Sequence, residues 1–78
     1  MKGEQKMNLN LNLIKRNSMQ VYNILSHYTR CTFAQLEQLC HMASTDLCLA
    51  LVQLMRENKV EQYTDSRIVY YRPLLLPA

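Results

Sequence analysis

The spacing of apolar residues predicts a first helix between about residues 15 and 29. Its N-cap is expected at Asn17 or Ser18, because either side chain can accept a hydrogen bond from a free backbone N–H. Four apolar side chains occur at positions i, i+3, i+4 and i+7, a pattern that places them on one face of a helix, toward a core. These four are Val21, Ile24, Leu25 and Tyr28.

Two shorter helices are predicted to follow, at about residues 33–40 and 44–57. Thr32 and Gln35 have the spacing of a capping box, in which each side chain bonds the backbone N–H of the other residue. Ser44 is expected to cap the third helix, with Asp46 in the first turn, where the helix dipole favours negative charge. The expected buried residues are Phe33, Leu36, Leu39 and Cys40 in the second helix, and Leu47, Ala50, Leu51 and Leu54 in the third.

The last part of the domain has the composition of a β-hairpin. Asn58 is expected to end the third helix in the left-handed conformation. Residues 60–63 and 67–72 are predicted strands, rich in β-branched and aromatic side chains, and residues 64–66 form the predicted turn. Pro73 ends the second strand because it lacks a backbone donor. The expected fold is mainly α with a small β-hairpin (α+β): three helices and a C-terminal two-stranded wing.

Charge divides the chain into a basic arm and a neutral body. The formal net charge of +3 comes entirely from residues 1–16, and residues 17–78 sum to zero. We therefore expect a flexible basic arm at 1–13, a folded domain at 14–73 and an apolar tail at 74–78. The Asn–Leu alternation of residues 8–13 leaves a second interpretation open, a short strand that pairs only with a partner or a second copy.

The cysteines indicate neither a disulfide framework nor a typical metal site. The chain has an odd number of cysteines, Cys31, Cys40 and Cys48, and none of them has CxxC spacing. The sequence also shows no secretory signal that would direct it to an oxidising compartment. They are expected to be reduced and packed as small hydrophobic residues. The alternative is a metal shared with His27 or His41; the favoured interpretation needs no metal and no cofactor.

Other absent patterns exclude further classes of protein. No apolar run approaches the ~20 residues that a membrane-spanning helix needs. The chain has no Gly-rich phosphate loop, carboxylate pair at useful spacing or nucleophile motif. His27 and His41 are expected to be surface or packed residues rather than catalytic bases. An enzyme is therefore not expected.

The order of these landmarks, from Val21 to Arg72, resembles the winged helix-turn-helix superfamily. Thr32 with Leu36 is similar to the "t..eL" opening of its second helix, and Ala50-Leu51 with Leu54 to the "aL..L" of its third. The segments 58–61 and 70–73 resemble the entry into the wing and its closing strand. In size the chain is similar to small bacterial and phage transcription regulators of this fold.

This resemblance implies a regulator of transcription that binds double-stranded DNA, in the cytoplasm and with the bacterial nucleoid. In the superfamily the third helix enters the major groove and the wing touches the backbone or minor groove. Thr45 and Gln53 could then contact base edges, and Arg56 a guanine or a phosphate. The implied nucleic-acid-binding residues are Lys15, Arg16, Thr45, Gln53, Arg56 and Arg67.

The third helix departs from a typical DNA-reading helix. Residues 44–58 hold Arg56 against Asp46 and Glu57, a formal net charge of −1, although phosphate neutralisation dominates non-specific DNA affinity. Its outward face also carries Cys48 and two larger apolar side chains. Either neighbouring residues cover them, or the alternative function applies: a winged-helix protein–protein interaction module without functional DNA contact.

A homodimer is expected, because one module of this size makes a small DNA interface. Met19 and Tyr22 flank the apolar face of the first helix, so they either contact a neighbouring subunit or complete the core. The candidate residues for the dimer or a protein partner are Leu9, Leu11, Leu13, Met19, Tyr22, Leu49, Val52, Leu74 and Leu75.

Overall fold

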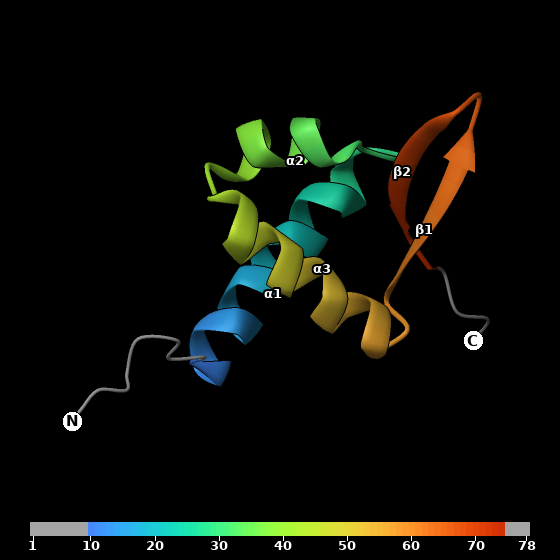
Figure 1. Ribbon diagram of the computed structural model, residues 1–78. Coiled ribbons are helices and arrows are strands. Elements are labelled where there is room, and N and C mark those ends of the chain that lie inside the picture. The colour runs from blue at the N-terminus through green and yellow to red at the C-terminus, as the bar shows by residue number, and fades with distance from the viewer. Residues whose placement is uncertain (1–9, 75–78) are drawn as a thin grey trace.

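Three helices and a two-stranded antiparallel hairpin follow one another along residues 10–74, the part of the chain that the computed structural model describes (Figure 1). This order confirms the predicted α+β fold class. The elements are α1 (Leu11–His27), α2 (Phe33–Cys40), α3 (Ser44–Arg56), β1 (Val60–Asp65) and β2 (Ile68–Pro73).

Helix α1 begins about four residues earlier than the apolar spacing predicts. The side chain of Asn10 is the N-cap and accepts a 3.1 Å hydrogen bond from the backbone N–H of Leu13. The prediction of Asn17 or Ser18 as the cap was wrong: both lie inside the helix, and the buried Ser18 hydroxyl donates to the carbonyl of Lys15. Residues 11–13 therefore belong to α1, not to the arm or a strand. Asn10 satisfies an amide at the helix start, and this local bond prevails over the period-two alternation.

The other end of α1 also differs from the prediction. The helix stops at His27, and Tyr28 is an extended C-cap residue whose side chain is 46% exposed. Tyr28 was therefore wrongly placed in the core. Because the chain turns extended at Tyr28, the fourth position of the predicted apolar face is lost.

The N-cap of α2 is the one predicted from the sequence, whereas the N-cap of α3 is not. Thr32 and Gln35 form the predicted capping box, with donor–acceptor distances of 2.8 and 3.2 Å. In α3 the N-cap is Ala43, which has no side-chain hydrogen bond, so Ser44 is not the cap. Ser44 is the first helical residue and its hydroxyl donates to the carboxylate of Glu37. The Ser44 hydroxyl is therefore hydrogen-bonded to Glu37 of α2 and not to the backbone of α3.

Thr32→Ala is expected to lower the free energy of unfolding by about 0.5–2 kcal/mol, because it leaves two amides at the start of α2 without side-chain partners. Chemical denaturation of the variant measures this difference. Ser44→Ala is the control and should cost less, since Ser44 caps no backbone N–H. Equal losses in the two variants would contradict the assigned caps.

The hairpin is joined to the helices by a short bridge. Tyr71 of β2 exchanges two backbone hydrogen bonds with Cys31, of 2.8 and 3.0 Å, beside the start of α2. The turn consists of Ser66 and Arg67, with φ of 53° and 69°. Two positive φ angles are typical of the type I′ turn of two-residue hairpins. The predicted turn at 64–66 was therefore displaced; Asn58, at φ 59°, has the expected left-handed conformation.

The core lies where α1, α2 and α3 meet the base of the hairpin. All four residues predicted to be buried in α3 are buried, and Val60 extends the core into β1. Ile24, Phe33 and Leu39 are only partly buried and pack against it. The buried hydrophobic residues are Val21, Leu25, Cys31, Leu36, Cys40, Leu47, Ala50, Leu51, Leu54 and Val60.

Candidate nucleic-acid interface

The outward face of α3 is open to solvent. Thr45, Leu49, Val52 and Arg56 follow the spacing i, i+4, i+7 and i+11, opposite the buried side of the helix. Thr45 and Arg56 are exposed, Leu49 is half-buried and Val52 is 41% exposed. Neighbouring residues thus cover Leu49 in part and leave Val52 accessible. The face has a polar residue at each end and an apolar centre.

The flanks of this face carry the remaining predicted residues of α3. Asp46 and Cys48 are exposed, and Gln53 is half-buried. The amide of Gln53 donates to the carboxylate of Glu57, so it is already engaged within the protein. Gln53 is therefore less free to meet a base edge than Thr45.

The wing presents Arg67 at its tip. Arg67 is the second residue of the two-residue turn, and its side chain is exposed. Figure 1 shows the hairpin extending away from the three helices, with this turn at its far end. The fold thus positions Arg67 apart from the body, at the end of a short antiparallel ribbon.

One face of the hairpin holds an aromatic and cationic stack that the sequence analysis missed. Tyr63 and Tyr70 lie opposite each other, with ring centroids 5.8 Å apart. The guanidinium of Arg30 lies 3.8 Å from the ring centre of Tyr70, and that of Arg72 lies 4.0 Å from that of Tyr63. The two guanidinium groups therefore flank the tyrosine pair and make cation–π contacts with it.

Carboxylates complete this stack and neutralise its cations. Arg30 donates to Asp65 at 2.7 Å, and this hydrogen bond is the main reason why the pKa of the Asp65 carboxyl lies below its ordinary value. Arg72 pairs with Glu61 across the strands. A turn placed at residues 66–67 in the sequence would have predicted which residues of the two strands lie opposite each other. It would not have predicted that Arg30, which lies outside the hairpin, joins the stack.

A third ion pair lies at the end of α3. Lys59 is 3.6 Å from the carboxylate of Glu57. The hydrogen bond from Gln53 is the main cause of the lowered pKa of Glu57, and the positive charges of Lys59 and Lys15 also lower it. Glu57 therefore stays ionised at neutral pH and offsets part of the positive charge near it.

Four of the basic side chains at residues 10–74 take part in no ion pair within that range. The range holds seven Lys and Arg residues, and Arg30, Lys59 and Arg72 are the three that are paired. The free ones are Lys15, Arg16, Arg56 and Arg67. They comprise every cation that the sequence predicted to contact nucleic acid, and they lie on α1, at the end of α3 and at the wing tip.

The predicted partner-binding residues fall on several surfaces. Leu11 and Met19 of α1 are 68% and 70% exposed, Leu13 is also exposed, and Tyr22 is half-buried. Leu74 is half-buried, and its backbone N–H donates to the carbonyl of Lys59. Leu9 and Leu75 lie outside the described residues.

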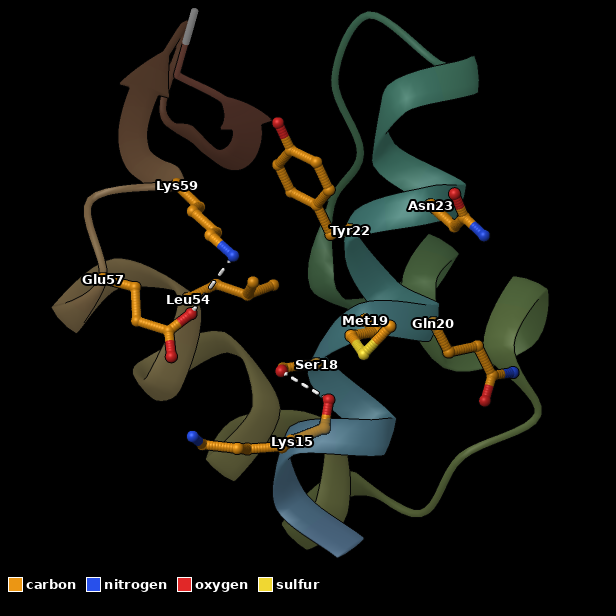
Figure 2. A pocket seen from close by; sticks show the side chains of 9 residues that line it. All are labelled: Lys15, Ser18, Met19, Gln20, Tyr22, Asn23, Leu54, Glu57 and Lys59. Carbon is orange, nitrogen blue, oxygen red and sulfur yellow. Dashed lines mark hydrogen bonds and ion pairs between the residues drawn. The ribbon is translucent and has the colours of Figure 1, made fainter. Parts of the chain in front are cut away.

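An open groove of about 570 Å³ separates α1 from the end of α3. Figure 2 shows Leu54, Glu57 and Lys59 on the α3 side of it and Met19 and Tyr22 on the α1 side, while the side chain of Lys15 extends from α1 toward α3. We call it the α1 groove.

The three cysteine thiols differ in exposure. Cys31 and Cys40 are buried, and burial raises the pKa of both thiols, whereas Cys48 is exposed. Within residues 10–74 no three His, Cys, Asp or Glu side chains are grouped so that they could hold a metal ion. No helix in this range has both the length and the apolar character needed to cross a membrane.

Neither a protein-family model nor a curated protein matches the chain. Its fold is similar to the solution NMR structure of protein BT2368 from Bacteroides thetaiotaomicron, with a TM-score of 0.75 over 83% of this chain and 79% of that one. The two sequences are 18% identical. At that identity the likeness concerns the fold alone.

Proposed function

We propose that this chain is a winged helix-turn-helix regulator of transcription that binds double-stranded DNA. The observation that carries the proposal is the distribution of free cations. Arg56 and Arg67 remain unpaired within the described residues, at the end of the α3 outward face and at the wing tip, while other basic residues are neutralised internally. Phosphate contacts by such cations supply most non-specific DNA affinity.

Each element would then have a separate role. The exposed hydroxyl of Thr45 would contact a base edge or phosphate, and Arg56 a guanine or a phosphate of the same groove. Arg67 would reach the neighbouring backbone from the tip of the wing. The proposed active form is a homodimer on DNA, because one module of this size makes a small DNA interface. Its proposed location is the cytoplasm, in association with the bacterial nucleoid.

The experiment that tests the proposal is enrichment of duplexes from a random pool, followed by fluorescence-anisotropy titration of the enriched duplex at several salt concentrations. A DNA-binding function predicts saturable binding that weakens as salt rises, with tighter binding to the enriched sequence than to the starting pool. Absence of saturable binding at low salt would exclude it.

Removing residues 1–9 is expected to weaken binding to any duplex and to reduce the salt slope by up to ~2, because each phosphate that a lysine neutralises contributes about 0.9 to that slope. The deletion removes Lys2 and Lys6 and keeps Asn10, the cap of α1. Lys2→Gln with Lys6→Gln in the full chain is the matched variant and should give the same change. An unchanged affinity and slope in both would show that the arm makes no phosphate contact.

A second function, binding of another protein without DNA contact, is favoured by the exposed apolar centre of α3. Val52 is 41% exposed, and Cys48 is exposed on the same helix. Asp46 at the start of α3 opposes the approach of phosphates. A partner on this surface would bury Val52 as an anchor, and the charges around it would form the rim.

A further inference from the structure

The first two turns of α1 lack buried residues of their own. The buried side chains of this helix are Ser18, Val21 and Leu25, so residues 11–17, about 10 Å of helix, contribute none. They continue the packed part of a 17-residue helix, and Ile14 and Asn17 are the only half-buried residues among them, so packing within the chain stabilises these turns little. A surface that packs against these turns would explain why they carry apolar side chains.

One face of α1 is exposed along nearly its whole length. Leu11, Lys15, Met19 and Asn23 follow one another at four-residue intervals, and all four are exposed. Leu11 and Met19 have the two largest exposed fractions among the exposed large hydrophobic residues at 10–74. Figure 2 shows that Met19 lies at the margin of the α1 groove, between Ser18 and Tyr22. Projecting side chains and a groove thus lie side by side on the same helix.

We propose that this face of α1 is a homodimer interface, in which two copies of α1 cross in antiparallel fashion about a two-fold axis at Met19. A two-fold interface uses the same patch on both copies and so needs a patch that complements itself. Met19 would meet its counterpart at the axis, and the helix of each copy would lie along the α1 groove of the other. The role of this dimer rests on the proposed function, because two copies would double the interface with DNA.

The charges on this face are compatible with that arrangement. In an antiparallel crossing centred on Met19, Lys15 of one copy lies opposite Asn23 of the other. The two lysines are then about 12 Å apart along the axis, beyond the Debye length of about 10 Å at 0.1 M salt. Each lysine would also approach the ring of Tyr22 in the second copy, where a cation–π contact is favourable. A parallel crossing in register would instead bring the two Lys15 side chains together.

The test is the mass of the full chain in solution without DNA, measured by sedimentation or light scattering. We expect twice the chain mass of 9.2 kDa. Met19→Lys should weaken association about tenfold or more while the thermal melt of the monomer stays cooperative, since Met19 is a surface residue. Ile68→Lys, which charges an exposed apolar residue of β2, is the control and should remain dimeric.

A cross-link checks the axis. In a Cys48→Ser background, which removes the exposed thiol, Met19→Cys should form a disulfide-linked dimer on mild oxidation, because the axis places the two copies of residue 19 together. Gln38→Cys, on the exposed side of α2, should not. A monomeric parent chain, or a dimer that survives Met19→Lys and is not cross-linked through residue 19, would overturn the inference. Either result would leave DNA contacts by α3 and the wing to be tested separately by titration.

Discussion

Replacing Leu51 or Leu54 by alanine is expected to lower the free energy of unfolding by about 2–5 kcal/mol in each case. Both side chains are 2% exposed, and they face α1 and the base of the hairpin from the inward side of α3. Truncation removes apolar packing and leaves a cavity that the surrounding helices fill only in part. A domain of this size has a total stability of about 4–12 kcal/mol, so either change removes a large share of it.

Thermal and chemical denaturation measure this loss, and Val52→Ala is the matched control. Val52 lies on the same helix but is 41% exposed, so its truncation should cost far less. A loss below about 1 kcal/mol at both leucines would contradict the assigned orientation of α3.

The second large effect separates the two candidate functions. If the outward face of α3 reads DNA, Arg56→Ala should weaken binding to the enriched duplex by about 1–3 kcal/mol and relax its sequence preference. Val52→Ser should then change little or strengthen binding, because it places a hydroxyl donor beside the phosphates. If the face binds protein, the order reverses: the apolar anchor carries the energy, and Arg56 is a rim residue of small effect.

The measurement is one titration per variant against the duplex, with a parallel titration against any purified protein partner. Leu49→Ser supplies a second apolar change, although Leu49 is half-buried and its replacement also affects stability. Unaltered DNA affinity in Arg56→Ala, with loss of partner binding in Val52→Ser, would contradict the DNA-binding proposal and support the protein-binding one.

Most of the fold follows from local patterns, and the exceptions have identifiable causes. Helix α3 was predictable because its four buried residues repeat at helical spacing, and α2 because the capping box is contained within four residues. The start of α1 was missed because the alternation before Leu13 has the period of a strand, whereas the Asn10 cap decides the conformation. The turn was misplaced because Ser66 and Arg67 adopt positive φ without glycine or asparagine.

The residues of the candidate site were predictable only where they lie on a single helix or strand. The outward face of α3 follows from helical spacing, so Thr45, Val52 and Arg56 were expected there and are exposed. The neutralisation of the wing was not predictable, because Arg30 is separated in sequence from Asp65 and meets it only through the bridge from the α1–α2 connection to β2. Arg72 of the wing pairs with Glu61 across the strands, whereas Arg67 takes part in no ion pair within residues 10–74.

The most direct test of DNA binding by α3 and the wing is an NMR titration of the isotope-labelled chain with the enriched duplex. Binding through these elements predicts saturable shifts in the amide signals of Thr45, Arg56 and Arg67, and little change at Gln38, which is exposed on α2. Shifts confined to α2, or no saturable shift with any duplex at low salt, would contradict it.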